Sequence, residues 1–366
     1  MNEQELKSLL QAIEPADAEA IAKAKARQLS LAKPPGSLGK LEDIAVQLAG
    51  ITGKQFNSLQ NKRIIVMCAD NGVVCEGVSS TPMSVTLSQA MNMTRHLTGM
   101  SSLAKYTGAQ VEVVDIGINA DYSHPLILDR SMGKGTKNLY KEPAMTRQQA
   151  IDAIAVGIER AFAAKEDGID VIGTGEMGIS NTTTSAAVLS ALTGLSVEDV
   201  TGRGAGLTDD AFEKKKHVIQ TALQLHQPDP KDPIDVLAKV GGFDLCGMCG
   251  TFLGAAMKKL PVVIDGYISI VAALCACRLA PLAADYMFPS HSSFEIGYLK
   301  AAQEIGLQPY LDMGMRLGEG SGCPLAFQIM DCACAFTNTM ATFEEAAIND
   351  DYLDQLKKGD SFTVKR

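Results

Sequence analysis

The feature that most constrains the fold is an alternation, from residue 63 onward, between short β-branched runs and longer helical stretches. Strands that are separated by helices pair in parallel, through right-handed crossovers. The sequence therefore predicts an α/β fold with a Rossmann-like parallel sheet flanked by helices. The predicted strands are RIIVMCA (63–69), VEVVDIG (111–117), IDVIGTG (169–175), LPVVID (260–265) and a weaker PYLDMG (309–314).

Four of these runs lead directly into segments rich in Gly, Asp and Asn, namely ADNGVV, GTGEMGISN, DGYIS and DMGMRLGEGSG. Ligands of open parallel sheets bind outside the carboxyl ends of the strands, where the strand order reverses. We therefore expect one site built from several loops.

The N-terminal part of the chain has the spacing of apolar residues that is typical of helices. Helical periodicity covers 4–31 and resumes at 38–51 after the breaker AKPPGSLG. A length of 366 residues also exceeds the roughly 250–300 residues of a single core. We expect an N-terminal helical region, and one large domain with a smaller satellite. The PDPKDP stretch at 228–233 is typical of a rigid connection between two helices.

The charge balance narrows the choice of partners and compartment. A net charge of −9 without any Lys/Arg run argues against nucleic acid as the main partner. No stretch of about 18 apolar residues appears, and the acidic N-terminus lacks a signal-peptide pattern. We therefore expect no membrane association and a cytoplasmic location.

Nine cysteines, most of them in apolar runs, are typical of buried thiols in a reducing compartment. The one CxxC pair, Cys246 and Cys249, has no second pair or histidines at zinc-ligand spacing. It lies in DLCGMCGTFLGAAM, a pattern typical of a packed helix, so we expect neither a metal nor a cofactor; metal or redox chemistry at the pair is the alternative.

The segment from Ile169 to Ser185 is the sharpest candidate for a ligand site. A strand ends in glycines, and a helix begins at Ser180, Asn181 and Thr182, which predicts free amides and hydroxyls around one point. A phosphate monoester fits such a site, and a well-capped glycine turn is the alternative.

The same segment matches G-x-G-x-x-G through Gly173, Gly175 and Gly178, with Glu198 about 20 residues further on, so a dinucleotide-binding fold is a second interpretation. Against it, Glu198 follows no second strand, and Glu176 would put a carboxylate inside the pyrophosphate loop.

Two further glycine loops carry charged side chains. Arg203 and Gly204 lie in TGRGAGL (201–207), which is followed by three consecutive lysines, at most two of which can face one site. Glu319 stands between glycines in RLGEGSG (316–322), an isolated carboxylate of the kind that a general base requires. Surface charges are the alternative for both loops.

Six motifs in this order resemble the nicotinate-nucleotide:dimethylbenzimidazole phosphoribosyltransferase family over almost the whole chain. They are KPPGSLGKLE, ADNGVVCEGVS (69–79), GTGEMGISNTT (173–183), GRGAGL (202–207), DGYIS (265–269) and RLGEGSG (316–322). The resemblance implies a large Rossmann-like catalytic domain over 61–330 and a small helical domain made of 1–60 with about 330–366. It also implies a dimer, either of identical chains or with a paralogous subunit.

The resemblance also implies an activity. An aromatic acceptor would displace nicotinate from the ribose C1′ of nicotinate mononucleotide, giving the α-riboside phosphate needed for the lower ligand of a cobamide. Glu319 would remove the acceptor's proton. Residues implied to hold ribose and phosphate are Gly175, Glu176, Met177, Gly178, Ile179, Ser180, Asn181, Arg203, Gly204, Lys214, Asp265, Gly266, Ser290 and His291.

The acceptor side departs from the family pattern. Asn71 stands where relatives commonly have a histidine, and residues 81–88 differ as well. This change leaves open a benzimidazole, adenine or a phenol such as p-cresol, for which Asp70 would assist or replace Glu319. The acceptor wall is predicted to contain Ser80, Met83, Ser88, Leu317 and Gly318. A non-catalytic subunit that completes a partner's site, and an NAD(P)-dependent oxidoreductase, are the competing hypotheses.

Overall fold

The computed structural model of the chain describes residues 1–204 and 206–353. Ala205, in the middle of the 201–207 loop, and the tail 354–366 lie outside the described residues. The contacts of the chain divide it into two compact units, 1–14 with 61–326 and 15–60 with 327–366. Residues 1–14 thus group with the larger unit, whereas the sequence placed them in the smaller one.

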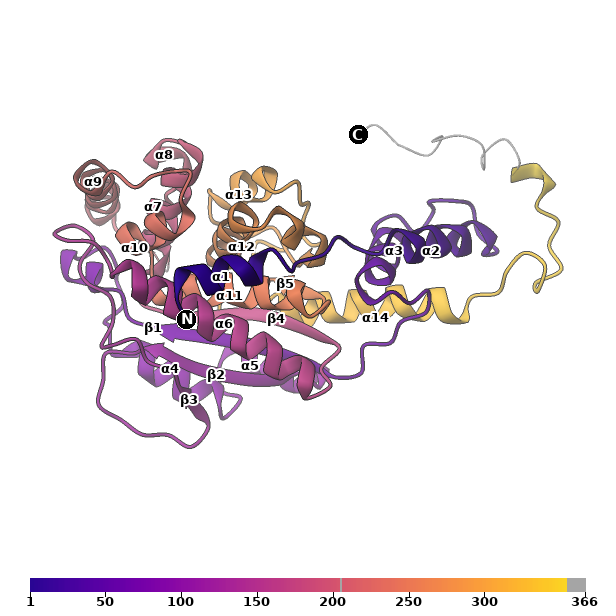
Figure 1. The fold of residues 1–366 in the computed structure, drawn as a ribbon, viewed down its shortest axis with the longest axis horizontal. Coiled ribbons are helices and arrows are strands. Elements are labelled where there is room, and N and C mark those ends of the chain that lie inside the picture. Colours follow the sequence, from indigo (N-terminus) through magenta and orange to yellow (C-terminus); the bar gives the residue numbers. More distant parts are fainter. Residues whose placement is uncertain (205, 354–366) are drawn as a thin grey trace. The chain divides into compact units, whose positions relative to one another are not determined.

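The larger unit contains one six-stranded sheet, in which every neighbouring pair is parallel and the order is β3-β2-β1-β4-β5-β6 (Figure 1). The strand order reverses between β1 and β4, so the carboxyl ends of these two strands form the topological switch point. The predicted Rossmann-like sheet is confirmed. The strands are β1 (Lys62–Ala69), β2 (Gln110–Gly117), β3 (Ile127–Asp129), β4 (Val171–Met177), β5 (Val262–Ile264) and β6 (Met287–Pro289).

One predicted strand is wrong. The PYLDMG run makes only an isolated bridge from Leu311 to His291, because Pro309 has no N–H to donate and Gly314 adopts a left-handed φ of 62°. The sheet instead ends in β6. Two strands, β3 and β6, were missed, because each has three residues and neither lies in an apolar β-branched run like LPVVID, which marked the equally short β5.

Helices connect the strands and cover the sheet. Helix α11 packs against β1, β2 and β4, and α6 packs on α11. Helices α7 to α10 form a cluster beyond β4 (Figure 1). The helices and 3-10 turns of this unit are α1 (Glu3–Leu10), η1 (Gly72–Glu76), α4 (Val85–Met93), α5 (Gly99–Thr107), α6 (Arg147–Glu166), α7 (Asn181–Thr193), α8 (Val197–Val200), α9 (Asp209–His226), α10 (Pro233–Val240), α11 (Phe243–Met257), α12 (Tyr267–Leu279), η2 (Pro281–Tyr286) and α13 (Tyr298–Glu304).

Helices α6 and α11 approach closely because glycines face the partner backbone. A Cβ at Gly157 would clash with the carbonyl of Gly247, and one at Gly250 would clash with Ile154. Cys246 and Cys249 are fully buried free thiols in this helix pair, and burial raises the pKa of both. The predicted packed helix is therefore present around the CxxC pair.

The smaller unit consists of α2 (Ala18–Ser30), α3 (Lys40–Thr52), the later part of α14 (Cys323–Thr339) and η3 (Asp351–Leu353). The helix predicted over 4–31 is interrupted after Leu10, because Pro15 lies in the break and Asp17 caps α2. A short bridge joins Leu31 to Thr342, so the two chain ends pair within this unit. Within the described part of the chain, every helix is too short or too polar to traverse a bilayer.

Candidate active site

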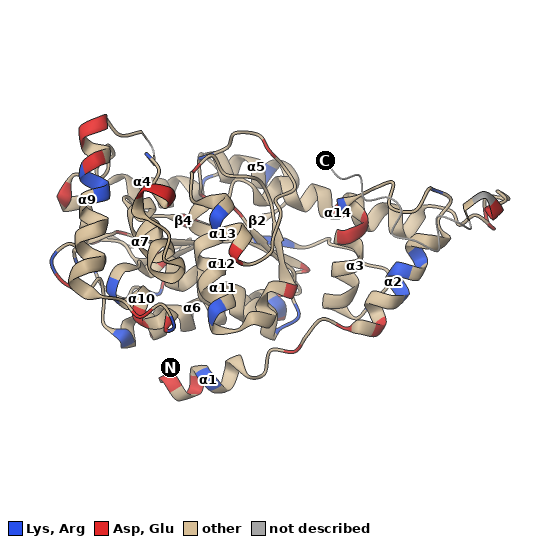
Figure 2. Cartoon of the chain, turned by 90° about the horizontal axis from the view of Figure 1, so that it is seen from above, with Lys and Arg blue, Asp and Glu red and all other residues tan. Residues whose placement is uncertain are grey.

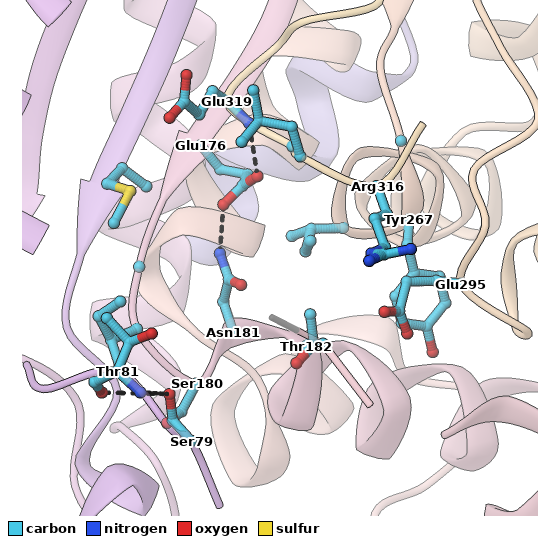
Figure 3. Close-up of a pocket in the computed structure, with 18 of the residues that line it drawn as sticks. Ser79, Thr81, Glu176, Ser180, Asn181, Thr182, Tyr267, Glu295, Arg316 and Glu319 are labelled. Carbon is cyan, nitrogen blue, oxygen red and sulfur yellow. Dashed lines mark hydrogen bonds between the residues drawn. The ribbon is translucent and has the colours of Figure 1, made fainter. Parts of the chain in front are cut away.

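A cavity of about 350 Å³ opens at the carboxyl ends of the central strands. The glycine loops that were separate in the sequence meet around it (Figure 3). Its walls come from the segment after β1 (residues 78–81), the β4–α7 loop (176–182), Arg203 and Gly204, the start of α12 (266–268) and the turn 316–319. The expectation of one site built from several loops agrees with this geometry.

Glu319 stands on a turn in which Gly318, Glu319 and Gly320 have successive φ values of 79°, 64° and 95°. Glycine adopts this left-handed region freely, whereas for a residue with a Cβ it costs about 1–3 kcal/mol. The Glu319 side chain is 5% exposed and lines the cavity. A strained residue kept at the centre of a cavity indicates that the position of its carboxylate matters.

Two donors hold the Glu319 carboxylate in place. Gln89 Nε2 lies 3.4 Å from Oε1, and the amide of Met100, in the first turn of α5, donates to Oε2 at 3.1 Å. These two contacts fix the orientation of the carboxylate at the cavity. Gln89 was missed, because nothing in the sequence showed that α4 turns this side chain, and not the neighbouring Ser88, toward the cavity.

Glu176 and Glu319 are joined through the backbone of the turn. The amide of Glu319 donates to Glu176 Oε1 at 3.1 Å, and Asn181 Nδ2 donates to Glu176 Oε2 (Figure 3). Asn181 Nδ2 also donates to Asp244 Oδ2 at 3.0 Å. Burial raises the pKa of Glu176 to about 8 and that of Asp244 to about 6. A cationic substrate is the kind of ligand that such a pair would stabilise.

Gly175 and Gly178 serve close packing of the backbone. A Cβ at Gly175 would clash with the carbonyl of Glu319, and one at Gly178 would clash with the carbonyl of Ala69. The G-x-G-x-x-G spacing is thus explained by the approach of β4 to the 316–322 turn and to β1, without a pyrophosphate.

Gly175→Ala is expected to lower turnover by about 10²-fold, because the methyl group displaces the turn that carries Glu319, the predicted general base, and misplacement of such a group by about 1 Å costs that much. Steady-state kinetics with the purified variant, together with its thermal midpoint, checks this. Full activity in a folded Gly175→Ala variant would show that the turn tolerates displacement.

The amino end of α7 differs from the expected cap. Ser180 precedes the helix with a φ of 75°, and its hydroxyl has no hydrogen-bond partner among residues 1–204 and 206–353, although it is buried and lines the cavity. The amides of Ile179 and Asn181 already donate to Thr86 Oγ1 and to the Gly178 carbonyl. The Ser180 hydroxyl is therefore an unpartnered group at this helix end that lines the cavity.

Lys215 is the buried lysine of α9, whereas Lys214 is exposed. Its Nζ lies 2.9 Å from Thr182 Oγ1 and 3.0 Å from the Gly202 carbonyl, directly behind the cavity wall. Burial lowers the pKa of Lys215 to about 8, against the opposing effect of the Glu295 carboxylate. Figure 2 shows basic and acidic residues side by side on α9, so the sequence pattern alone did not identify the buried one.

Comparisons with known proteins identify the same family that the six sequence motifs predicted. The family model described as "Phosphoribosyltransferase" matches residues 13–348. The nicotinate-nucleotide–dimethylbenzimidazole phosphoribosyltransferase of Clostridium perfringens is 52% identical, over 98% of this chain and 99% of the relative. The chain belongs to this family. The prediction from the six motifs is confirmed, as is the prediction of a phosphoribosyltransferase.

Further relatives give the same result. The enzyme of that name from Clostridium tetani is 49% identical, over 94% of this chain and 95% of the relative. A crystal structure of the Thermus thermophilus enzyme superposes with a TM-score of 0.86 at 36% identity, covering 91% of this chain and 99% of that one. Members of the family thus share both the sequence and the sheet described above.

Three residues that the family resemblance assigned to ribose and phosphate binding lie behind the wall of the cavity. Asp265 contacts the amides of the 316–322 turn, and the Ser290 hydroxyl lies 3.0 Å from His291 Nδ1 and donates to the Asp265 carbonyl. Burial lowers the pKa of His291 to about 4, so the ring is neutral. None of these three side chains lines the cavity. Gly266, in contrast, does.

The residues predicted for the acceptor wall lie in different surroundings. Ser80, Leu317 and Gly318 line the cavity, together with Val85 and Gln89. Met83 instead lies against Asn119, and Ser88 is exposed. Asp70 is buried away from the cavity, where its Oδ2 accepts from the Asn119 amide at 2.8 Å.

Asn71, which the sequence singled out as a departure from the family pattern, donates from Nδ2 to the Ile179 carbonyl in the β4–α7 loop at 3.4 Å. It does not line the cavity. The opposite wall holds three residues that the sequence did not single out, Tyr267, Glu295 and Arg316 (Figure 3).

Proposed function

We propose that the chain transfers the phosphoribosyl group of nicotinate mononucleotide to a ring nitrogen or a phenolic oxygen of an aromatic acceptor, releasing nicotinate, as a step of cobamide biosynthesis. The observation that carries this proposal is the Glu319 carboxylate, held at the cavity by two donors in a chain whose relatives bear that activity in their names. The acceptor that those names state is dimethylbenzimidazole.

The reaction requires one proton acceptor and stabilisation of one cationic carbon. The acceptor nitrogen forms a bond to C1′ as the bond from C1′ to the pyridinium nitrogen breaks, and that electron pair neutralises the departing nicotinate ring. The acceptor's proton passes to Glu319. Attack from the face opposite the leaving group gives the α-riboside. The cationic ring of the bound nicotinate mononucleotide favours ionisation of Glu176, whose pKa burial raises to about 8, and the ionised carboxylate then offsets the positive charge that develops at C1′.

The phosphate is best placed at the α7 end of the cavity. The Ser180 hydroxyl, Thr182 and the Lys215 cation behind Thr182 meet there, with Arg203 at the rim. A phosphate dianion is held by charge-assisted bonds of this kind. This arrangement assigns to Lys215 the role that the sequence assigned to Lys214.

The acceptor ring is proposed to lie against Val85 and Leu317, with Ser80 and Gln89 beside it. Because Asp70 lies outside the cavity, Glu319 is the base for every acceptor considered. An oligomer, either a homodimer or a heterodimer with a paralogous subunit, would cover the exposed apolar side chains Phe294, Ile296, Leu299, Met313 and Leu317. The nine free cysteines fit a cytoplasmic location.

Incubation with nicotinate mononucleotide and, separately, dimethylbenzimidazole, adenine and p-cresol tests the proposal. Nicotinate release, measured by chromatography, is expected with at least one ring and not without acceptor. Absence of release with every ring, both alone and with a paralogous subunit, would refute it. Saturable binding of NAD(P) with indifference to nicotinate mononucleotide would favour the oxidoreductase instead.

A further inference from the structure

The carboxylate of Asp265 is clamped between two amides of the turn that carries Glu319. Asp265 directly follows β5 and is 2% exposed. Its Oδ2 accepts from the Gly320 amide at 3.0 Å, and its Oδ1 accepts from the Gly322 amide at 2.6 Å. Asp265 does not line the cavity, so its carboxylate is directed at the backbone of the turn.

The turn depends on such support. Residues 318 to 320 all have left-handed φ values, and Glu319 adopts one despite its Cβ. The amide of Glu319 itself donates to Glu176 Oε1. Three amides between residues 319 and 322 therefore donate to two buried carboxylates, which come from the ends of two neighbouring strands.

We propose that Asp265 is a positioning residue for Glu319: its carboxylate holds the amides of Gly320 and Gly322 and so keeps the turn in the conformation that directs Glu319 into the cavity. This inference rests on the proposed function of Glu319 as the base. It gives Asp265 a role through the backbone of the turn, without contact to substrate.

The surroundings of Asp265 make this clamp sensitive to pH. The ionisable groups that face it are the neutral His291, whose Nδ1 lies 3.9 Å from Oδ1, Glu319 from the turn, Glu176 from β4, Tyr298 from α13 and Cys323 from α14. Burial, only partly offset by the amide bonds, raises the pKa of Asp265 to about 7. A proton on Asp265 removes one of the two acceptors, so the clamp is complete only above that pH.

Stability and activity should therefore respond to pH in opposite directions. Between the ordinary aspartate pKa near 4 and the folded value of about 7, the unfolded chain has lost the Asp265 proton while the folded chain keeps it. The contribution of Asp265 to stability thus falls as pH rises through this window and is constant above it. Turnover, in contrast, rises in the same window.

Asp265→Asn tests the proposal. An asparagine offers one acceptor oxygen to two amides, so kcat at pH 8 is expected to fall by about 10²-fold, while the KM for nicotinate mononucleotide changes by less than about threefold. The urea midpoint at pH 8 should not fall, since the variant removes a buried charge. A matched control is Ser269→Ala, which removes the hydroxyl that accepts from the Asp265 amide and leaves the carboxylate clamp intact. This control should keep kcat within about threefold.

Retention of kcat by Asp265→Asn would overturn the inference, and so would a rise in KM equal to the loss of kcat/KM. A second measurement needs neither turnover nor a folded variant. Hydrogen exchange of the Gly320 and Gly322 amides in the unaltered protein should show protection factors that fall about tenfold as pH is lowered from 8 to 6. Constant protection would also overturn it. If the unaltered protein releases no nicotinate with any acceptor, the proposed function fails, whereas the exchange experiment still tests the clamp.

Discussion

Glu319→Gln is expected to lower nicotinate release by about 10²–10⁴-fold, because the variant keeps the shape of the side chain and loses the group that takes the acceptor's proton. The KM for nicotinate mononucleotide should change little, since Glu319 is proposed to act on the acceptor. Initial rates over a range of acceptor concentrations measure both quantities.

Glu213→Gln is the matched control for this variant. Glu213 is an exposed carboxylate on α9 that pairs with Lys216 and does not line the cavity. The same chemical change there should leave turnover unaltered. If Glu319→Gln instead turned over at the normal rate in a complex with a paralogous subunit, the chemistry would reside in that subunit or would use another base.

Lys215→Met is expected to raise the KM for nicotinate mononucleotide by about 10²-fold, because a charge-assisted contribution of about 3 kcal/mol to phosphate binding disappears. The variant also removes one of the two cations, Lys215 and Arg316, that lower the pKa of the buried Glu295 carboxylate, so we expect a loss of stability as well. Kinetics at a temperature well below the thermal midpoint separates the two effects.

Lys214→Met and Lys216→Met distinguish among the three lysines. If the buried lysine holds the phosphate end, both of these variants bind nicotinate mononucleotide normally. The double variant Lys215→Met with Glu295→Gln should recover stability without recovering binding. A large effect of Lys214→Met alone would contradict the assignment to Lys215 and would indicate that the exposed lysine reaches a site on a partner chain.

Much of the fold could be predicted because its signals are local. The β-branched runs at 63–69 and 111–117 correspond to β1 and β2 almost residue by residue. The weak run at 309–314 was misleading, since Pro309 and Gly314 prevent a ladder that its apolar residues suggest. The three-residue strands β3 and β6 lack the β-branched run that marked the equally short β5, so they were not predicted.

The sequence predicted the glycine-flanked carboxylate of the candidate site, but only some of the residues that surround it. Gly318 and Gly320 around Glu319 show in the sequence that a backbone must bend sharply beside a carboxylate, and the structure has that bend. Which residue of α4 contacts the Glu319 carboxylate depends on how the helix is rotated about its axis. This rotation places Gln89 at the cavity and Ser88 in solvent. Consecutive residues on a helix differ by about 100° in direction, and local sequence does not determine which of them faces inward.

By itself the sequence determined the parallel sheet, the family and the glycine loops, because strand alternation, motif order and backbone freedom are properties of short segments. The tertiary structure decided which polar groups are buried together. Lys215 beside Thr182, Asn181 between Glu176 and Asp244, and Asp265 on the turn amides each join residues from different strands and helices. Burial sets the charge and the direction of such groups, and burial exists only once the chain has folded.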